Sequence, residues 1–438
     1  MRTEIVAGLT TFMTMAYIIF VNPAILGGED TGLPISGVFF ATCVAAAAAC
    51  IAMGVVANFP VALASGLGLN AIVAFTLILG LGLSWQEAMA VVVLEGLLVT
   101  ILVLTNLREA VMNAIPMSLK FAIAVGIGLF IAFIGLKNGG IVVQDPATYL
   151  ALGDFTQGPV LLAGFGLILT LALVARGVRG GILAGIVLTG VIGMVFGVVP
   201  LPDSFVSFSF DTSTIGGGVL AVPQVLQITL IPVIFALFMT DFFDTMGTVI
   251  AVGQEGKLLD ENGRPPKLKR ILLIDSFGAV GGGAMGASSV TSYIESGSGV
   301  AEGGRTGMTS VVVGLLFLLA LPFAPIIGVF GGSIPIPGPA EGDILVSPVT
   351  APALVVVGFL MMTAVRFIPW EEFDEAIPAF LTILTLPLTF NISYGIGFGF
   401  ISYVLIKLAR GRPGDVHPLL YGAAALFALV FVAEPFIS

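Results

Sequence analysis

Long apolar runs follow one another along almost the whole chain, and short polar or glycine-rich stretches separate them. About 20 predominantly apolar residues suffice for a helix to cross a bilayer, so the pattern predicts an all-α polytopic membrane protein. We expect 14 transmembrane segments and a further apolar run, Leu419–Ile437, that is either another span or an interfacial segment. The expected segments are Ile5–Leu26, Val38–Val56, Pro60–Phe75, Trp85–Leu104, Leu119–Leu136, Val160–Ala175, Ile182–Val199, Leu226–Val252, Ile271–Gly283, Ala284–Gly304, Met308–Phe330, Pro352–Val365, Ile377–Phe390 and Ile392–Leu408.

Two of these segments, the third and the tenth, contain residues that disfavour a continuous helix. In the third, Gly66 and Gly68 precede Asn70, a polar residue in an apolar setting. In the tenth, the small and polar run 286–292 is followed by Glu295 and then by residues that can begin a helix. Broken helices in corresponding halves of a transporter present backbone groups to a ligand at mid-membrane depth. The two interruptions therefore predict a ligand site.

Four acidic residues lie in or beside the apolar segments of the second half: Asp241, Asp244, Asp275 and Glu295. A charge at membrane depth is costly and usually marks a substrate or proton site. Residues three or four apart share one face of a helix, so Asp241, Asp244 and Thr248 are expected to point the same way. Any one of these acids can be a hydrogen-bonded structural group, but four together favour a functional site.

Composition narrows the function classes. The chain of 438 residues is 58% hydrophobic and 10% charged, and its net charge of −10 argues against a nucleic-acid partner. His417 is the only histidine, and Cys43 and Cys50 both lie in an apolar segment, so we expect no disulfide framework, metal site or cofactor. An intramembrane enzyme is disfavoured because no Ser/His pair, metal-spaced set or phosphate loop is present.

The distribution of charge predicts the orientation of the chain in the membrane. With the N-terminus in the cytoplasm, most Lys and Arg residues fall on the cytoplasmic side, as the positive-inside rule requires. Seven segments per half is an odd number, so the halves have opposite orientation and form inverted repeats. We expect a surface helix at Arg108–Ile115, a structural pairing of Glu95 with a polar group of another helix, and a first apolar run that is retained rather than cleaved.

Several stretches resemble one family closely. The sequence looks like the AzgA-like purine permeases, a branch of the nucleobase–ascorbate (nucleobase:cation symporter-2) transporters, and the resemblance covers nearly the whole chain in order. It implies proton-coupled uptake of adenine, guanine or hypoxanthine, without ranking them, across the cytoplasmic membrane and usually by a homodimer. The stretches that carry the resemblance are RTEIVAGLTTFMTMAYIIFVNPAIL, GLGLNAIVAFT, DFFDTMGT, TSYIESGSGVAEGGRTG and FGFISYVLIKL.

The same resemblance implies a division into a core domain and a gate domain. Segments one to four and eight to eleven form the core, segments five to seven and twelve to fourteen form the gate, and short strands in segments three and ten cross near mid-membrane. The core is also expected to move against the gate as an elevator. The corresponding ranges are 1–107 and 223–335 for the core, 108–222 and 336–412 for the gate, and 413–438 for the extra C-terminal segment.

The resemblance also assigns roles to the acidic residues. The acidic position of the family's eighth segment falls on Asp244, that of the tenth on Glu295, and the aspartate of the ninth on Asp275. Asp241 matches a further position of the family's motif. We expect Asp244 and Glu295 to bind substrate. Asp241 and Asp275, with Thr248, are expected to support the site or to carry the coupled proton.

The chemistry of a purine suits these residues. A purine presents neighbouring donors and acceptors along one flat edge, and a carboxylate accepts two such donors. Backbone amides near Leu69, Asn70, Tyr293 and Ser296 can donate to ring nitrogens or carbonyl oxygens. The candidate binding residues also include Ile294 of the tenth segment.

A flat ring also favours an apolar or aromatic slot, for which Phe238, Phe242 and Tyr293 are candidates, although each is more often a packing residue. A carboxylate in a low-dielectric site can hold a proton near neutral pH, which suits coupling.

Two other transporter classes stay open at this point. An anion transporter of the same architecture, for sulfate or bicarbonate, should offer cations and helix N-termini to its ligand. Here the ionisable groups expected near the middle of the membrane are acidic, which favours a purine permease over an anion transporter. A uracil or xanthine permease is the other alternative, and the extra C-terminal apolar run is less typical of those relatives.

Overall fold

The computed structural model describes residues 1–105, 115–227, 230–261, 264–338 and 343–437, with side chains to Val432. The surface helix expected at Arg108–Ile115 therefore falls almost wholly outside the described residues. In the first half the helices and strands, with η marking 3₁₀ or π helices, are α1 (Arg2–Met15), α2 (Ile18–Leu26), α3 (Ile35–Ala52), η1 (Met53–Ala57), β1 (Leu63–Ser65), α4 (Leu67–Ala71), η2 (Ile72–Gly80), α5 (Trp85–Thr105), α7 (Met117–Asn138), β2 (Val142–Asp145), β3 (Tyr149–Leu152), α8 (Gly158–Ala175), α9 (Gly181–Val195), α10 (Gly217–Leu220) and η3 (Val222–Val225).

Like the first half, the second half begins with long helices, continues with a short strand that leads into a short helix, and then has further helices and a β-hairpin. Its elements are α11 (Ile231–Glu255), α12 (Leu268–Met285), β4 (Val290–Ser292), α13 (Ser296–Ala301), α14 (Gly307–Ala320), η5 (Leu321–Phe323), α15 (Ala324–Gly331), β5 (Ile334–Pro337), β6 (Asp343–Val346), α16 (Ala351–Met362), η6 (Thr363–Phe367), α17 (Phe373–Leu388), α18 (Ile392–Ala409), η7 (Pro413–Asp415) and α19 (Pro418–Ile437).

The helices are those of a membrane protein. Within the described residues, eight helical stretches are long and apolar enough to cross a bilayer, and four more are apolar but shorter. The shorter ones include residues 67–80, where the third segment was expected to break, and residues 418–432 of the extra C-terminal run. The predicted helical membrane architecture is confirmed, whereas the count of 14 segments stays a prediction.

Two short strands meet in the interior of the molecule. β1 and β4 pair antiparallel, with Leu63 opposite Ser292 and Ser65 opposite Val290. Each strand runs directly into a short helix, α4 after β1 and α13 after β4, so the third and tenth segments are strand–helix units as expected. Backbone groups inside a membrane must be hydrogen-bonded within the protein, and each of the two strands supplies hydrogen-bond partners for the N–H and C=O groups of the other.

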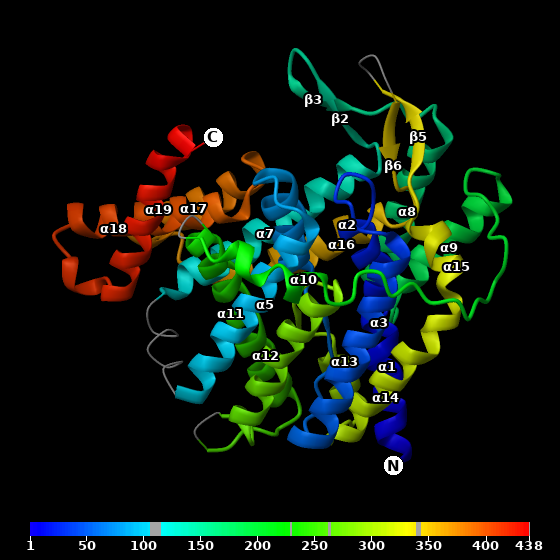
Figure 1. The fold of residues 1–438 in the computed structure, drawn as a ribbon, viewed down its shortest axis with the longest axis horizontal. Helices are drawn as coiled ribbons and strands as arrows, with labels where there is room; N and C mark the ends of the chain where they lie inside the picture. The colour runs from blue at the N-terminus through cyan, green and yellow to red at the C-terminus, as the bar shows by residue number, and fades with distance from the viewer. Residues whose placement is uncertain (106–114, 228–229, 262–263, 339–342, 438) are drawn as a thin grey trace.

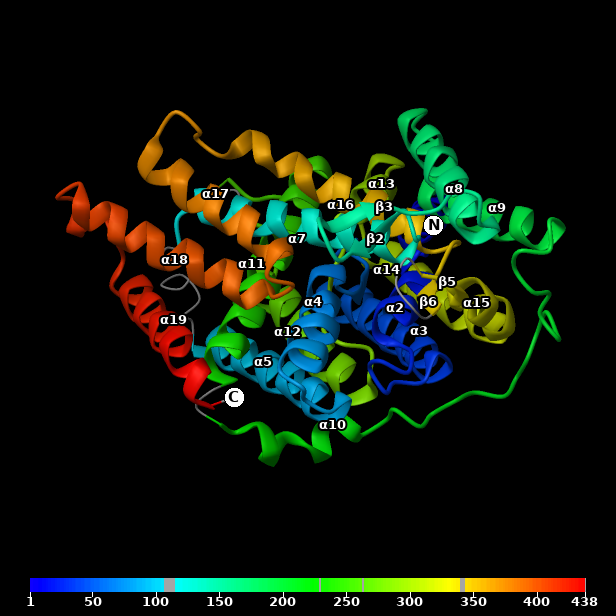
Figure 2. The ribbon, with the colours of Figure 1, turned by 90° about the horizontal axis from the view of Figure 1, so that it is seen from above.

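Helices from both halves pack together (Figures 1 and 2), and the paired strands contact α3, α11 and α12. On one side, α1 and α3 lie against α14, and α5 lies against α12. On the other side, α7 lies against α16 and α17, and α17 lies against α18. In Figure 2 the pairs α8–α9 and α18–α19 occupy opposite ends of the molecule. The strand pair therefore lies between helices that are distant in sequence.

Three details differ from the expected layout. The first span is broken, because α1 ends at Met15 and α2 begins at Ile18, with Tyr17 in the break. The stretches between the fifth and sixth and between the eleventh and twelfth expected segments, for which no element was predicted, contain the antiparallel hairpins β2–β3 and β5–β6. The hairpins were not predicted from the sequence because each strand has only four residues, which is too few to show a clear alternation of apolar and polar positions.

Glycines allow α7 and α16 to approach closely. A Cβ on Gly128 would lie 2.7 Å from the carbonyl oxygen of Gly358 and 2.8 Å from Cβ of Met361. A Cβ on Gly358 would lie 2.7 Å from Cβ of Ala132. Small residues at such crossings let two membrane helices touch through their backbones.

The crossing predicts the effect of one added methyl group. Gly358→Ala should force α16 away from α7 and lower the thermal unfolding midpoint in detergent, corresponding to about 1–3 kcal/mol of overpacking. Gly281→Ala is the matched control, because a Cβ on Gly281 in α12 would meet nothing within 4 Å. Equal midpoints for the two variants would contradict the close approach.

Candidate functional site

A cavity of about 350 Å³ lies where the two strand–helix units meet α1, α11 and α16. This volume is within the range of small-molecule sites. Polar and acidic residues come from the break in α1–α2, from α11 and from the segment after β4, whereas α16 supplies only apolar residues. The lining residues are Tyr17, Gly66, Leu67, Gly68, Asp244, Thr248, Ser292, Tyr293, Ile294, Glu295, Val357, Leu360 and Met361.

Glu295 is held in place by the break in the first span. It forms the N-terminal boundary of α13, directly after β4, so the strand pair fixes its backbone. The hydroxyl of Tyr17 donates a hydrogen bond of 2.5 Å to Oε1 of Glu295. The Tyr17 side chain is buried, and its contact leaves Oε2 of the carboxyl group for a ligand.

Asp244 provides the second carboxyl group of the cavity. It lies on α11, and Thr248 lies one turn further along the same helix and also lines the cavity. Its carboxyl group interacts electrostatically with that of Glu295. Two carboxyl groups from different elements therefore line the same cavity. This arrangement suits a ligand that carries several hydrogen-bond donors on one edge.

The opposite wall is apolar. Val357, Leu360 and Met361 project from α16 into the cavity lining. α16 packs on α7, so this wall belongs to a different group of helices from the one that carries the acids. A cavity with acceptors on one side and an apolar surface on the other suits a flat, polar-edged ring.

Asp275 lies behind the cavity, and each of its two carboxyl oxygens accepts a hydrogen bond from a side chain. Thr245 donates a hydrogen bond of 2.7 Å to Oδ2, and Ser292 donates one of 2.8 Å to Oδ1. Thr245 also lies 2.8 Å from the hydroxyl of Thr291 in β4. Asp275 therefore ties α12 to α11 and β4, and so supports the strand that carries the cavity lining.

Asp241 lies one helical turn from Asp244 and is fully buried. Its carboxyl group interacts with that of Glu95 on α5, which is also fully buried. The polar partner expected for Glu95 is thus another acid. None of the four carboxyl oxygens has a hydrogen-bond partner among the described residues.

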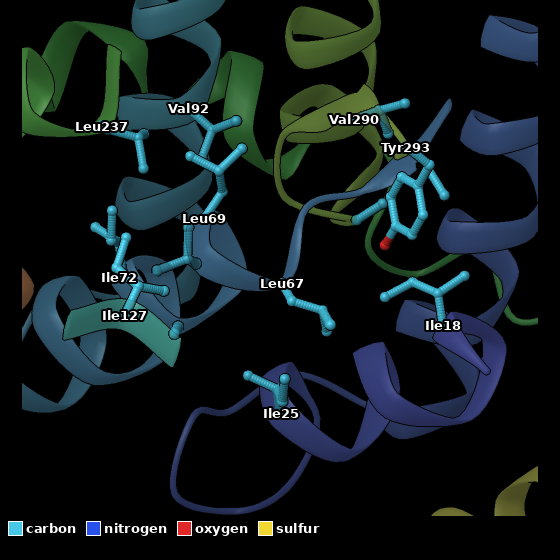
Figure 3. Packing of buried hydrophobic residues seen from close by; sticks show 14 of the residues in the cluster. Ile18, Ile25, Leu67, Leu69, Ile72, Val92, Ile127, Leu237, Val290 and Tyr293 are labelled. Carbon is cyan, nitrogen blue, oxygen red and sulfur yellow. The ribbon is translucent and has the colours of Figure 1, made fainter. Parts of the chain in front are cut away.

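Five of the residues expected to contact substrate do not line the cavity. Phe238 packs against Phe242 with ring centroids 5.7 Å apart, so neither ring forms the slot. Leu69 lies with Val92 and Leu237 and away from Tyr293, as Figure 3 shows. Asn70 and Ser296 are buried outside the lining.

Several of the expected backbone donors are already engaged. The amide of Asn70 donates to the carbonyl of Gly66, that of Tyr293 to Ala62, and that of Ser296 to Tyr293. The first turn of α4 begins at Leu67, and first-turn amides lack an intrahelical acceptor. The amide donors near the cavity are therefore better sought at residues 67–69 than at the positions expected from sequence.

Sequence reasoning missed the most direct partner of Glu295 and the whole apolar wall. Tyr17 lies in an apolar run with no obvious break, so the local sequence does not mark it as a site residue. Val357, Leu360 and Met361 are ordinary residues of an apolar helix, so no local pattern marks them. Among the described residues, no cluster of three or more His, Cys, Asp or Glu side chains could hold a metal ion.

Known proteins match the chain along its length. The family profile described as "Permease family" (Xan_ur_permease) matches residues 2–398. The guanine/hypoxanthine permease PbuG of Bacillus subtilis is 43% identical over 439 residues, covering 98% of this chain and 96% of that protein. The adenine permease AdeP of Escherichia coli is 41% identical over 431 residues, covering 98% of this chain and 93% of that protein.

Solved structures share the fold. The transmembrane domain of the cyanobacterial bicarbonate transporter BicA superposes with a TM-score of 0.60, covering 91% of this chain and 97% of that chain. Its sequence identity to this chain is 15%, so the likeness concerns the fold alone.

The contact between Tyr17 and Glu295 predicts the effect of removing one hydroxyl group. Tyr17→Phe should leave Glu295 without its anchor and weaken binding of the purine expected from the sequence by about tenfold, equivalent to about 1.4 kcal/mol. Binding of radiolabelled adenine and guanine to purified protein measures this.

Tyr421→Phe is the control, because the Tyr421 hydroxyl donates to the carbonyl of Pro413, in η7 beyond the cavity. Unchanged affinity in Tyr17→Phe would show that Glu295 needs no positioning by this hydroxyl.

Proposed function

Because this chain belongs to the permease family, we propose that it is a transporter that takes up purine nucleobases. Relatives named as guanine/hypoxanthine and adenine permeases match it almost end to end, which supports purines as the substrate class. Transport fits a chain with many apolar helices and a ligand-sized cavity in its interior. We place the protein in the cell membrane with its N-terminus in the cytoplasm.

The arrangement of the cavity is the observation that carries this proposal. Glu295 and Asp244 offer acceptors for the N–H donors of a purine edge, and Leu360 and Met361 offer an apolar surface for the ring face. Amides of residues 67–69 are suited to the ring nitrogens and exocyclic acceptors. Each part of the base thus has a partner of matching chemistry.

The fold by itself does not select a substrate, because a bicarbonate transporter shares it. An anion needs cationic or N–H donors around it, and two carboxyl groups in the lining would repel it. No Lys, Arg or His side chain of the described residues lines the cavity. The site therefore favours a neutral heterocycle with donor groups over sulfate or bicarbonate. A uracil or xanthine permease is the weaker alternative, since the named relatives transport other bases.

We further propose proton-coupled uptake by an elevator motion in a homodimer. In this proposal the core, residues 1–107 and 223–335, carries the acids and the paired strands, and moves against the gate, residues 108–222 and 336–412. The cavity supports this division, because its polar lining comes from the first set of residues and its apolar wall from α16 of the second. Asp241 and Asp275 support the site from behind or carry the coupled proton.

The proposal predicts that the Glu295 carboxylate is indispensable. Glu295→Gln should lower purine affinity at least about 100-fold, because the amide replaces an acceptor by a donor that faces the donors of the base. Uptake of radiolabelled adenine, guanine, uracil and sulfate by one expressing strain measures both the selectivity and the loss.

Glu302→Gln is the matched control in the same segment, since Glu302 pairs with the exposed Arg179 and has no contact with the cavity. Purine uptake by Glu295→Gln at the level of Glu302→Gln would refute direct binding by Glu295. Uptake of sulfate instead of purines would refute the assigned substrate class.

The elevator proposal predicts that a link between core and gate stops transport. A Cβ on Gly68 would lie 3.1 Å from Cγ2 of Ile127 on α7, so cysteines at these two positions should form a disulfide on oxidation. Purine uptake should fall on oxidation and return on reduction, which makes the reduced double variant its own control. Full uptake by the cross-linked protein would exclude movement of α4 along α7.

A further inference from the structure

We propose that Glu95 and Asp241 share a single proton and together form the proton-coupling site of the transporter. This inference rests on the proposed purine transport and deepens it, because it assigns the coupled proton to a pair that joins α5 to α11. Glu95 was expected from sequence to be a structural residue, and the pair lies outside the cavity lining.

The geometry of the pair requires a proton. Both side chains are 0% exposed, and none of the four carboxyl oxygens has a hydrogen-bond partner among the described residues. Thr291 is the donor group nearest to Asp241, but its hydroxyl lies 2.8 Å from that of Thr245, which itself donates to Asp275. The two groups interact across the packed helices α5 and α11, and a carboxylate can only accept hydrogen bonds. Two ionised carboxylates cannot occupy one buried space, whereas a single proton makes one group a donor and the other its acceptor.

No Lys, Arg or His side chain of the described residues forms an ion pair with Glu95 or Asp241. Lys120 of α7 lies instead over the ring of Phe243 on α11, 4.1 Å from its centroid. The other ionisable groups that act on the pair are Asp244 on α11 and Asp275 on α12, and both are acids. Glu295, at the start of α13, faces Asp244 on the cavity side. Lys407 of α18, which also packs on α11, is held by Asp374 and Glu375 at 2.8 Å each. Of the other elements that pack on α5 and α11, α4, η2, α10, η3 and β4 carry no titratable side chain. The tyrosines of α18 and α19 have contacts of their own: Tyr403 donates to Glu375, Tyr421 donates to the carbonyl of Pro413, and Tyr394 packs edge-on against Phe431.

The pair is placed to respond to substrate. Asp241 and Asp244 are three residues apart on α11, so they lie on one face of the helix, and Asp244 lines the cavity. A base that engages Asp244 changes the charge one helical turn from the pair. Asp275, by contrast, accepts one hydrogen bond on each carboxyl oxygen, so donors of the protein already stabilise its ionised form.

The step itself is a simple protonation. A proton from the outer solution binds to the two carboxylates and leaves them with one negative charge and one internal hydrogen bond. The same proton leaves to the cytoplasm after the base is released, when the movement of the core brings the two carboxyl groups into contact with water and both can be ionised. No other bond is made or broken. A proton gradient can then drive accumulation of the base.

The test compares two transport modes of purified protein in liposomes. Glu95→Gln and Asp241→Asn replace one acid by an amide that is always able to donate, so both imitate the protonated pair. Both variants should exchange internal for external radiolabelled adenine or guanine at the wild-type rate, within about twofold, but should lose the accumulation driven by an imposed pH gradient. Glu87→Gln is the matched control on the same helix, where Glu87 accepts hydrogen bonds from Ser84 at the start of α5.

The outcomes separate the pair from the proposed function. If Glu95→Gln accumulates the base in response to the pH gradient as the wild type does, the pair is only structural. If a sodium gradient alone drives accumulation by the wild-type protein, the pair does not carry the coupled ion. Absence of purine exchange in the wild-type protein would instead refute the proposed substrate.

Infrared difference spectra provide a readout that does not depend on transport. Wild type minus Glu95→Gln, and wild type minus Asp241→Asn, should each contain the C=O band of a protonated carboxyl group at neutral pH, while wild type minus Glu87→Gln should not. Spectra without this band would overturn the shared proton.

Discussion

The antiparallel pairing of β1 with β4 is the constraint on which the rest of the structure depends. Two chain segments leave helical geometry inside an apolar protein, and their backbone groups are satisfied by each other and by nearby side chains. Cys50 hydrogen-bonds both backbone groups of Leu63 at 3.1 Å, and Ser296 accepts from the amide of Ala62. Because the strands end at α4 and α13, the pairing fixes Gly66–Gly68 and Glu295 beside each other.

This constraint explains how acids can be kept inside the molecule. Glu295 is anchored by Tyr17, and Asp275 by Thr245 and Ser292, so each is tied to the strand pair or to its neighbours. Asp244 faces the cavity and has room for a ligand. Among the described residues, no side chain or backbone group forms a hydrogen bond to the carboxyl oxygens of Glu95 and Asp241. This difference separates Asp275, which supports the site, from a pair that must hold a proton.

Much of this arrangement could be predicted from the sequence, because membrane spans are visible as long apolar runs and buried charges are visible as acidic residues within those runs. The glycines around Asn70 and the small residues before Glu295 marked the broken segments, and the acids of α11 marked the site. Tyr17 and the wall made by Leu360 and Met361 could not be found, since both depend on how distant helices pack. The pairing of Glu95 with Asp241 was hidden for the same reason, as 146 positions separate two acids that are each unremarkable alone.

The most direct test of the account is an experimental structure of the protein with adenine or guanine bound. The account predicts that the edge of the base lies against the carboxyl groups of Glu295 and Asp244, and that one ring face lies against Leu360 and Met361 of α16. A base held elsewhere, or held in this cavity without contact to either carboxyl group, would contradict it.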